Sequence, residues 1–390
     1  MPERTGYDRI LMIPALILVV FGIVMVYSSS NLIAIRRYGT SFYFLKNQIV
    51  WAVTGITGML VAMNFDYKRL RRLSLPMIII SVLLLIAVLI PHIGTEVNGA
   101  KRWIRFIGLS FQPSELAKLT IIITISAYIS KRANRMEDFV YGFLPPVVLL
   151  GLFQMLIMLQ PDMGTAIAMG VMVLTLLFIG GVRIPHIFSL TIPLIPFIVK
   201  VLFNAGYRKK RLIAFIDPWS DPTGAGFQVI QSLLALGSGG LFGLGLGEGK
   251  QKLFFLPEPH TDFIYSLIGE ELGFVGASLV IFLYLLILWR GVRIAIRIDD
   301  PFGRSLATGL TFMIGIQALI NLGVVTGLLP PKGLPLPFVS FGGTALLMNM
   351  VGLGILLNIS RNINKVSLPK SSARGWVKPE FRGERGPVEP

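Results

Sequence analysis

Apolar residues form about ten long runs along the chain, separated by shorter polar segments. A helix needs about 17 to 25 apolar residues to cross roughly 30 Å of hydrocarbon, and most of the runs approach or exceed that length. They cover residues 10–27, 44–63, 75–90, 116–129, 143–159, 165–179, 187–203, 263–289, 307–329 and 345–359. The pattern predicts an all-α integral membrane protein with about ten transmembrane helices.

Composition agrees with this reading of the pattern. Hydrophobic residues make up 54% of the chain and charged residues 14%, with a mean hydropathy of +0.73, whereas about a quarter of a soluble domain is charged. The first run is not a cleavable signal peptide, because it lacks a small-residue cleavage site and further spans follow. The chain has no cysteine, which excludes disulfides.

The basic residues predict an orientation in the cytoplasmic membrane. An even number of spans puts both termini on one side, and most basic clusters fall on that side: residues 68–72, 131–135, 290–304 and 361 onward. Cytoplasmic loops carry an excess of Lys and Arg, so both termini are expected in the cytoplasm. The net charge of +16 then reflects mainly membrane anchoring and attraction to anionic lipid.

A smaller set of basic residues faces outward in this topology. Lys and Arg at an outer membrane surface suit a ligand that carries phosphate on a lipid. The set comprises Lys101, Arg102, Arg105, Arg208, Lys209, Lys210, Arg211, Lys250, Lys252 and Lys332.

Two parts of the chain differ in character, a membrane domain at residues 1–362 and a basic cytoplasmic tail at 363–390 whose composition predicts disorder. Within the domain, an outward segment of about residues 204–262 is long enough to suggest a function. Its apolar stretch, residues 229–236, suits a short helix at the membrane interface. Its glycine-rich stretch, GSGGLFGLGLGEGK, lacks the Walker spacing, so its glycines are expected to permit tight turns and close packing.

Four polar clusters interrupt the apolar pattern, and all four fall at the outer face. In the first, Glu115 and Lys118 share a helical face and can pair, either to tolerate burial or as a charged wall of a cavity. In the second, Asp162 is expected to cap the helix that follows it. The clusters are residues 98–118, 160–165, 256–272 and 330–344.

The third cluster contains the candidate for acid–base chemistry. Thr261 is a plausible helix N-cap, which puts Asp262 in the first turn, where the helix dipole keeps a carboxylate ionised. Capping electrostatics and a general base are therefore both open for Asp262. His260 fits a hydrogen-bonding role better than a metal ligand. Glu270 and Glu271 lie about two turns deeper and need partners such as Lys118 or water.

The fourth cluster has four prolines that force an extended, broken segment, which is tolerated at this depth where it lines a cavity. Lys332 in it is a candidate for phosphate binding, with an interfacial anchoring lysine as the alternative. An outward cavity with one carboxylate, several cations and apolar walls suits a lipid-linked, phosphate-bearing substrate. The carboxylate would take a proton from a sugar hydroxyl while cations stabilise a departing pyrophosphate, as glycosyl transfer requires.

Five segments of these clusters resemble the signature segments of the SEDS family (shape, elongation, division and sporulation), multi-span bacterial peptidoglycan polymerases. They are NGAKRWI, FQPSELAK, QPDMGT, FLPEPHTDFIYSLIGEELG and PPKGLPLPFVSFGGT, in the family's order. The last, with its lysine, is more similar to the cell-division branch than to the elongation branch. Phe341 departs from the tyrosine that is common at its position.

The resemblance implies polymerisation of lipid II, carried on undecaprenyl pyrophosphate, outside the cytoplasmic (inner) membrane at the division septum. It implies Asp262 as the general base, Glu115 and Lys118 as a polar pair in a central cavity, and Lys332, Ser340 and Gly343 in the last outward loop. The expected substrate-binding set is Glu115, Lys118, Lys101, Arg102, Arg105, His260, Thr261, Lys332, Ser340 and Gly343.

The implied partners are a class B penicillin-binding protein, the transpeptidase FtsI, and other proteins of the divisome; no nucleic acid is expected. No cofactor follows from the residues, and a divalent cation, Mg or Mn, at the pyrophosphate is left open. Two alternative functions stay open as well. One is a flippase that moves lipid II across the membrane, and the other is a catalytically idle role in recruiting the transpeptidase.

Overall fold

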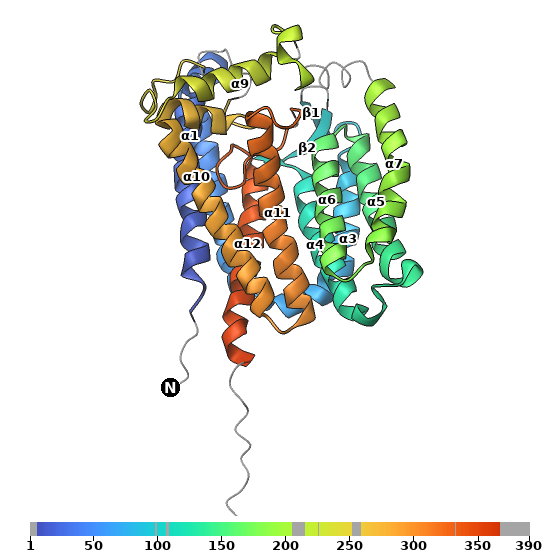
Figure 1. The fold of residues 1–390 in the computed structure, drawn as a ribbon. Coiled ribbons are helices and arrows are strands. Elements are labelled where there is room, and N and C mark those ends of the chain that lie inside the picture. Colours follow the sequence, from blue (N-terminus) through green and yellow to red (C-terminus); the bar gives the residue numbers. More distant parts are fainter. Residues whose placement is uncertain are drawn as a thin grey trace, which may run out of the picture.

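The computed structural model describes residues 6–97, 100–106, 109–204, 215–224, 226–251, 259–331 and 333–366. Helices that run along a common direction form a bundle (Figure 1). They are α1 (Arg9–Tyr38), α2 (Tyr43–Asn64), α3 (Tyr67–Ala87), α4 (Pro113–Lys131), α5 (Leu144–Leu159), α6 (Met163–Ile179), α7 (Ile184–Asn204), α10 (Ile264–Arg297), α11 (Pro301–Val325) and α12 (Gly343–Val366). Each apolar run of the sequence coincides with one of them.

Length and apolar composition identify seven of the described helices as able to cross a membrane: α1, α2, α3, α5 with the π-helical turn before it (Phe139–Phe143), α10, α11 and α12. α6 is a shorter apolar helix, and α4 carries the charged residues Glu115 and Lys118. A 3-10 turn, Ala133–Arg135, follows α4. This architecture confirms the expected helical, multi-pass membrane protein.

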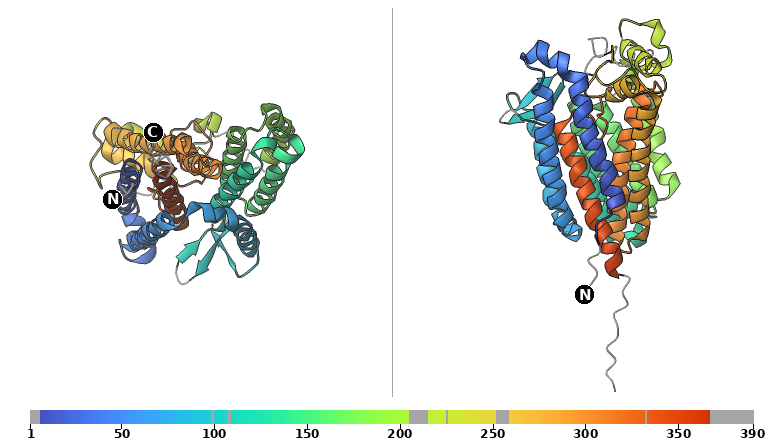
Figure 2. Two further views of the ribbon diagram at one scale, coloured as in Figure 1. Left: turned by 90° about the horizontal axis from the view of Figure 1, so that it is seen from below. Right: turned by 90° about the vertical axis from the view of Figure 1, so that its left-hand side faces the viewer.

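Burial separates the inner helices from the outer ones. In their most apolar stretches, 72% of α11 and 78% of α12 is buried, compared with 17% of α3. Seen from below, α12 lies inside the ring of the other helices (Figure 2). Large apolar side chains such as Leu75, Val148 and Phe282 are exposed on outer helices, as expected where lipid is the solvent. Polar residues on α11 and α12 therefore face protein.

The start of α1 and the end of α12 lie at the same end of the bundle (Figure 1). The backbone N–H of Asp8 donates to Ser360 Oγ at 3.4 Å, and Arg290 Nη2 lies 2.5 Å from Asp8 Oδ2. The N–H of Tyr67 at the start of α3 donates to Asn358 Oδ1 near the end of α12. The basic clusters beside these residues thus share the end that the sequence pattern assigned to them.

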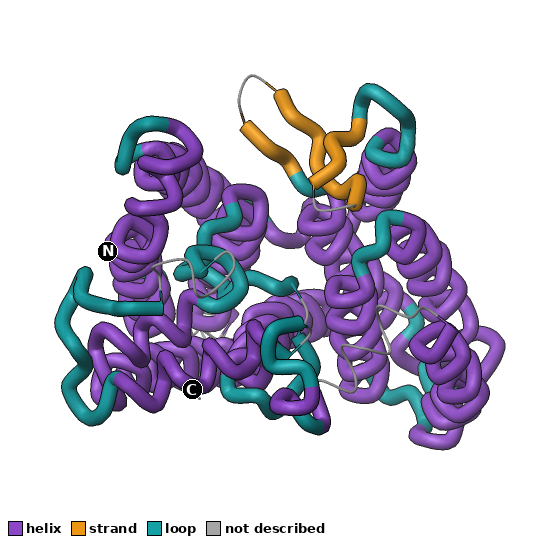
Figure 3. Tube along the Cα trace, turned by 90° about the horizontal axis from the view of Figure 1, so that it is seen from above, coloured by secondary structure: helices purple, strands orange, loops and turns teal. Residues whose placement is uncertain are grey.

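The opposite end carries a small antiparallel sheet that the apolar pattern did not predict. Its strands are β1 (Gly94–Val97), β2 (Ala100–Phe106) and β3 (Leu109–Phe111), in the order β1-β2-β3. Seen from above, the strands lie at one side of the helix ends (Figure 3). β2 holds Lys101, Arg102 and Arg105, so the sheet fixes where three of the predicted outward cations sit.

The long segment before α10 contains a 3-10 turn, Pro218–Ser220, and a helix, α9 (Phe227–Ser238), at the sheet's end of the bundle (Figure 1). α9 confirms the short helix expected at residues 229–236. Ser232 on its buried face lies 2.7 Å from Ser266 Oγ and donates to the carbonyl of Val325 at 2.6 Å. These bonds connect α9 to α10 and α11.

The glycines after α9 permit a close approach to α10, as the sequence predicted. Gly243 has φ 82°, and a Cβ there would lie 2.2 Å from the carbonyl oxygen of Glu271. Gly273 interrupts α10 with φ 67° and ψ −165°, and a Cβ there would lie 2.3 Å from the Gly243 nitrogen. Only glycine fits such contacts, since a left-handed φ and the missing Cβ are both required.

Candidate functional site

A turn at residues 259–263, before α10, and the loop at residues 333–342, before α12, lie against each other at the sheet's end of the bundle. Three consecutive carbonyls of the turn each accept a hydrogen bond from outside it. The N–H of Phe341 donates to the carbonyl oxygen of His260 at 2.9 Å. The hydroxyl of Ser340 donates to the carbonyl oxygen of Thr261 at 2.5 Å, and Asn321 Nδ2 donates to that of Asp262 at 2.8 Å. The backbone that carries Asp262 is therefore fixed by the loop and by α11.

The Asp262 carboxylate is half-buried at the contact between the turn and the loop. A Cβ on Gly333 would lie 3.1 Å from Asp262 Oδ2, so the absence of a side chain at Gly333 lets the loop approach the carboxylate. Lys332, the predicted phosphate-binding residue, precedes Gly333 and lies outside the described residues. The same holds for Arg208, Lys209, Lys210, Arg211 and Lys252 and for the tail from residue 367 onward.

The expected helix start at Thr261 is wrong. α10 begins at Ile264 with Phe263 at the N-cap, so Asp262 precedes the first turn instead of lying in it. The physical reason is that the carbonyls of Thr261 and Asp262 accept hydrogen bonds from Ser340 and Asn321, whereas in a helix capped by Thr261 they would accept from N–H groups four residues later. The backbone contacts, more than the helix dipole, hold Asp262 in place.

His260 is buried between two aromatic rings. Its ring centroid lies 4.4 Å from that of Phe44 on α2 and 5.5 Å from that of Phe341. Burial, with a smaller contribution from the charge of Arg37, lowers the pKa of His260 to about 4. The imidazole is therefore neutral near pH 7 and supplies no positive charge. Phe341 contacts both rings through its own ring, without needing the tyrosine hydroxyl that is common in the family.

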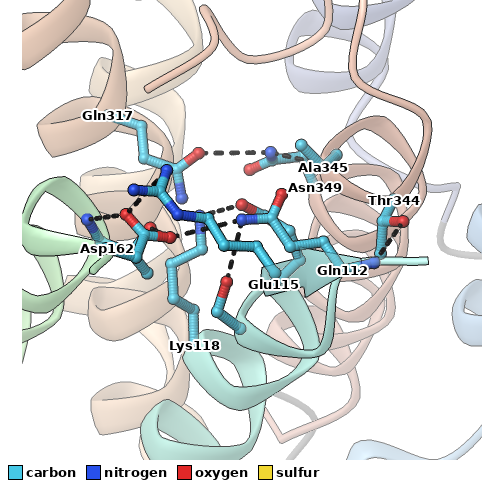
Figure 4. A network of polar contacts seen from close by, with 11 residues as sticks. Gln112, Glu115, Lys118, Asp162, Gln317, Thr344, Ala345 and Asn349 are labelled. Carbon is cyan, nitrogen blue, oxygen red and sulfur yellow. Dashed lines mark hydrogen bonds and ion pairs between the residues drawn. The ribbon is translucent and has the colours of Figure 1, made fainter. Parts of the chain in front are cut away.

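Inside the bundle, Glu115 and Lys118 form the ion pair that their spacing predicted. Lys118 Nζ lies 2.8 Å from Glu115 Oε1, and the side chains are only 1% and 3% exposed (Figure 4). Beside them, Asn349 Nδ2 of α12 lies 3.4 Å from Gln317 Oε1 of α11. Among the described protein atoms, Glu115 Oε2 and Asn349 Oδ1 have no donor and Gln317 Nε2 has no acceptor. This buried polar cluster can therefore bind further polar groups.

Arg102 links the sheet to the start of α6, which lies beside this cluster (Figure 4). Its Nη1 lies 3.8 Å from Asp162 Oδ1, and its Nε donates to the carbonyl of Gln160 at 3.2 Å. Asp162 accepts from Thr165 N–H at 3.2 Å and Thr165 Oγ1 at 2.9 Å, which confirms the predicted cap of α6. Gln112 Nε2 completes the link, 3.4 Å from Asp162 Oδ2 (Figure 4).

The other two cations of β2 do not share that position. β2 is irregular at Arg102, because Thr95 pairs with Trp103 and Glu96 with Lys101, which leaves Arg102 as an extra residue on the strand. Lys101 is half-buried and Arg105 exposed. Of the three predicted basic residues of this strand, Arg102 is the one for which the described residues show contacts with Asp162 and with the carbonyl of Gln160.

Glu270 and Glu271 do not pair with Lys118, which had been considered as their partner. Glu270 Oε1 accepts from the backbone N–H of Lys250 at 2.7 Å, and both carboxylate oxygens of Glu271 lie within 2.7 Å of Ser28 Oγ on α1. The two glutamates thus join the glycine-rich loop and α1 to the first half of α10.

Ser340 and Gly343 have structural contacts that the sequence did not specify. Ser340 Oγ donates to Thr261 and accepts from Leu336 N–H at 2.9 Å. A Cβ on Gly343 would lie 2.1 Å from Trp51 Nε1, so glycine lets the start of α12 contact α2. In the described part of the chain, no three His, Asp or Glu side chains gather as metal ligands would.

Four amides of the site were not predicted from the sequence: the half-buried Gln112 and the buried Gln317, Asn321 and Asn349. A signal was present on α11, because Gln317 and Asn321 are four residues apart in an apolar run and therefore share a helical face. Gln317 contacts the buried cluster and Asn321 the Asp262 turn. One face of α11 consequently joins the two halves of the site.

Comparisons with known proteins identify relatives over most of the chain. The chain resembles a probable peptidoglycan glycosyltransferase FtsW of Geobacter metallireducens, 46% identical over 92% of this chain and 96% of the relative. It is 42% identical to stage V sporulation protein E of Bacillus subtilis, over 92% of this chain and 98% of that one.

Two solved structures have a similar fold. One is a chain of a peptidoglycan synthase complex that coordinates polymerization and crosslinking, with a TM-score of 0.76 and 30% identity over 92% of this chain and 98% of that one. The other is the rod shape determining protein RodA of Thermus thermophilus, with a TM-score of 0.67 and 28% identity over 93% and 99%. A family model described as cell cycle protein, covering FtsW, RodA and SpoVE, matches residues 8–365. The chain therefore belongs to the FtsW/RodA/SpoVE family of cell cycle proteins, as its motifs predicted.

Proposed function

We propose that the protein is a peptidoglycan glycosyltransferase that polymerises lipid II, with Asp262 as its general base. Relatives that match more than nine-tenths of the chain carry that enzyme name. The observation that carries the proposal is the position of Asp262, which is half-buried against the loop at residues 333–342 and whose turn is fixed by that loop and by α11. A carboxylate held in this way is already ordered, so no further conformational entropy is lost in positioning it for proton transfer.

In the proposed reaction, Asp262 takes the proton from a hydroxyl of the acceptor sugar as that oxygen forms a bond to the anomeric carbon of the donor. The bond between that carbon and the pyrophosphate breaks, and the undecaprenyl pyrophosphate leaves with the electron pair. Outward basic residues, Arg102 and Lys332 among them, stabilise its charge. His260 takes no part as a cation because it is neutral.

The setting of the reaction follows the same proposal. The end of the bundle that carries Asp262 and the sheet faces outward from the cytoplasmic membrane, and both termini face the cytoplasm. The protein acts at the septum with a class B penicillin-binding protein, the transpeptidase FtsI, and other divisome proteins. Its likeness to a chain of a complex that coordinates polymerization and crosslinking supports a transpeptidase partner.

The experiment that tests the proposal compares purified wild type with Asp262→Asn and Asp262→Ala, each in complex with the transpeptidase, on labelled lipid II. General-base catalysis contributes about 10²- to 10⁴-fold, so we expect polymerisation to fall by at least the lower figure. Asp299→Asn, at an exposed position at the other end of the bundle, is the matched control. Polymer formed at the wild-type rate by Asp262→Ala would refute the assignment and favour a structural role.

A lipid II flippase is not favoured as the alternative. A flippase needs a polar path through the membrane, which Glu270 and Glu271 could line together with Glu115 and Lys118. Instead, Glu270 bonds the glycine-rich loop and Glu271 bonds Ser28, both away from the Glu115–Lys118 pair. The relatives' names describe a glycosyltransferase as well.

A further inference from the structure

Asn321 of α11 joins the two segments on either side of the Asp262 carboxylate. We infer that it is a positioning residue for the proposed reaction: its amide sets the distance between that carboxylate and the loop at residues 333–342. The inference rests on the proposed function of Asp262. Asn321 itself is buried and is placed to act through the backbone of its neighbours.

The geometry uses the full donor capacity of the amide. An asparagine side chain has two N–H donors, and Asn321 Nδ2 lies 2.8 Å from the carbonyl oxygen of Asp262 and 2.8 Å from that of Leu334. An aspartate at this position would replace the two donors with a carboxylate oxygen, which cannot donate to the carbonyls of Asp262 and Leu334. A leucine of similar size would leave both carbonyls without this donor.

The two bonded carbonyls identify what the amide controls. Leu334 follows Gly333, the residue whose Cα faces Asp262 Oδ2, and the other bonded carbonyl belongs to Asp262 itself. Ser340 and Phe341 also bond the turn, but they hold Thr261 and His260. Asn321 is thus the described residue that bonds both Asp262 and the chain beside Gly333.

A second asparagine provides a matched control at the other end of the bundle. Asn358 of α12 is also buried and also bonds two backbone groups, with Nδ2 2.7 Å from the Met63 carbonyl and Oδ1 3.1 Å from the Tyr67 N–H. Its replacement removes a similar pair of buried hydrogen bonds without touching the Asp262 turn. A loss of activity in Asn321 variants that is absent from the matching Asn358 variant therefore reports positioning and not general destabilisation.

The first test is kinetic, with the full chain in complex with its transpeptidase and lipid II as substrate. Misplacement of a catalytic group by about 1 Å can cost about 10²-fold, so we expect Asn321→Leu and Asn321→Asp to lower kcat by about 10- to 100-fold with KM changed by less than about twofold. Asn321→Ser, which keeps one donor, should fall between these variants and wild type. Asn358→Leu should lower the melting temperature but keep kcat within about twofold.

Two kinetic results would overturn the inference. One is a kcat for folded Asn321→Leu within about twofold of wild type, while Asp262→Ala is inactive. The other is an equal loss of kcat in Asn358→Leu at equal melting temperature. If Asp262→Ala polymerises lipid II at the wild-type rate, the proposed role of Asp262 is refuted. That result is distinguishable from a failure of the Asn321 inference, in which Asp262→Ala is inactive and Asn321→Leu is fully active.

The second test does not depend on activity. The chain has no cysteine, so Asp262→Cys with Gly333→Cys places the only two thiols, and a Cβ on Gly333 would lie 3.9 Å from Asp262 Cγ. We expect oxidation to form the disulfide readily in this background and at least fivefold more slowly when Asn321→Leu is added. Adding Asn358→Leu should leave the rate unchanged. Equal rates in all three proteins would contradict the positioning role.

Discussion

At the scale of single residues, Lys118 and Glu115 show how strongly burial can change the value of an ion pair. Both side chains are almost wholly enclosed, and Lys118 Nζ lies 2.8 Å from Glu115 Oε1. The chain also contains a surface pair, Arg183 and Glu137, at 2.6 Å with side chains 63% and 69% exposed. Removing one partner from a buried pair leaves an uncompensated charge, whereas water replaces a lost surface partner.

Substitutions of these two pairs should therefore differ in cost. We expect Lys118→Met or Glu115→Gln alone to destabilise the protein by about 3 to 5 kcal/mol, and the double variant to recover part of that loss. Glu137→Gln should cost less than about 1 kcal/mol. Melting temperatures in detergent measure all four variants. Equal, additive losses from Lys118→Met and Glu115→Gln would show that the two charges are not coupled.

The same scale shows what single residues reveal in a sequence. Asp262, Glu115 and Lys118 were found because ionised groups in apolar surroundings are costly and therefore conspicuous. Asn321 was missed because an uncharged amide in an apolar run gives no comparable signal, and its two acceptors are backbone groups of Asp262 and Leu334 that are distant in the sequence. Backbone partners of this kind follow only from the fold.

At the scale of elements, α10 owes its shape to one residue. Gly273 breaks the helix with φ 67° and ψ −165°, and the chain of Gly243 packs where its side chain would be. The break lets the amides of Phe274 and Val275 donate to the carbonyls of Gly240 and Leu241, at 2.9 and 3.1 Å. The glycine-rich loop is thereby bonded to α10 on both sides of the break.

A side chain at this position should be costly. Gly273→Ala forces a non-glycine residue into a backbone region that costs about 1 to 3 kcal/mol, and its Cβ also overlaps Gly243, so we expect a loss at the upper end of that range or beyond. Gly151→Ala is the matched control, since a Cβ there meets nothing within 4 Å and alanine favours helix. Thermal unfolding measures both. Equal stability of the two variants would show that the break is not needed.

Helices and strands could be predicted from the sequence where their position does not depend on contacts with residues distant in the chain. The ten long helices follow from apolar runs, because no other element short of a closed barrel spans a membrane. The three strands were missed since they are three to seven residues long and mix aromatic, basic and glycine residues. The start of α10 was misplaced because Ser340 and Asn321 compete for its first carbonyls.

At the scale of the whole molecule, the two ends of the bundle differ in what they carry. One holds the start of α1, the end of α12 and the basic clusters, with Asp8 bonded to Arg290 and Ser360. The other holds the sheet, α9 and the Asp262 turn (Figure 1). From the excess of basic residues we propose that the first end faces the cytoplasm, and this orientation can be tested.

Single cysteines can report that orientation, because the wild-type chain has none. Glu248 and Asp299 are exposed at opposite ends of the bundle. We expect Glu248→Cys to react with a membrane-impermeant maleimide in intact spheroplasts, and Asp299→Cys to react only after the membrane is permeabilised. The reverse pattern would place the Asp262 turn in the cytoplasm, where it could not polymerise an outward substrate.

Gln317 and Asn321 lie four residues apart on the inner helix α11, and their common direction requires that spacing to stay constant. Each residue turns an α-helix by about 100°, so one inserted residue between them would direct the two amides to different sides of the bundle. The surface loops can gain or lose residues without such an effect. Variation in chain length should therefore be tolerated outside the bundle and excluded between these two positions.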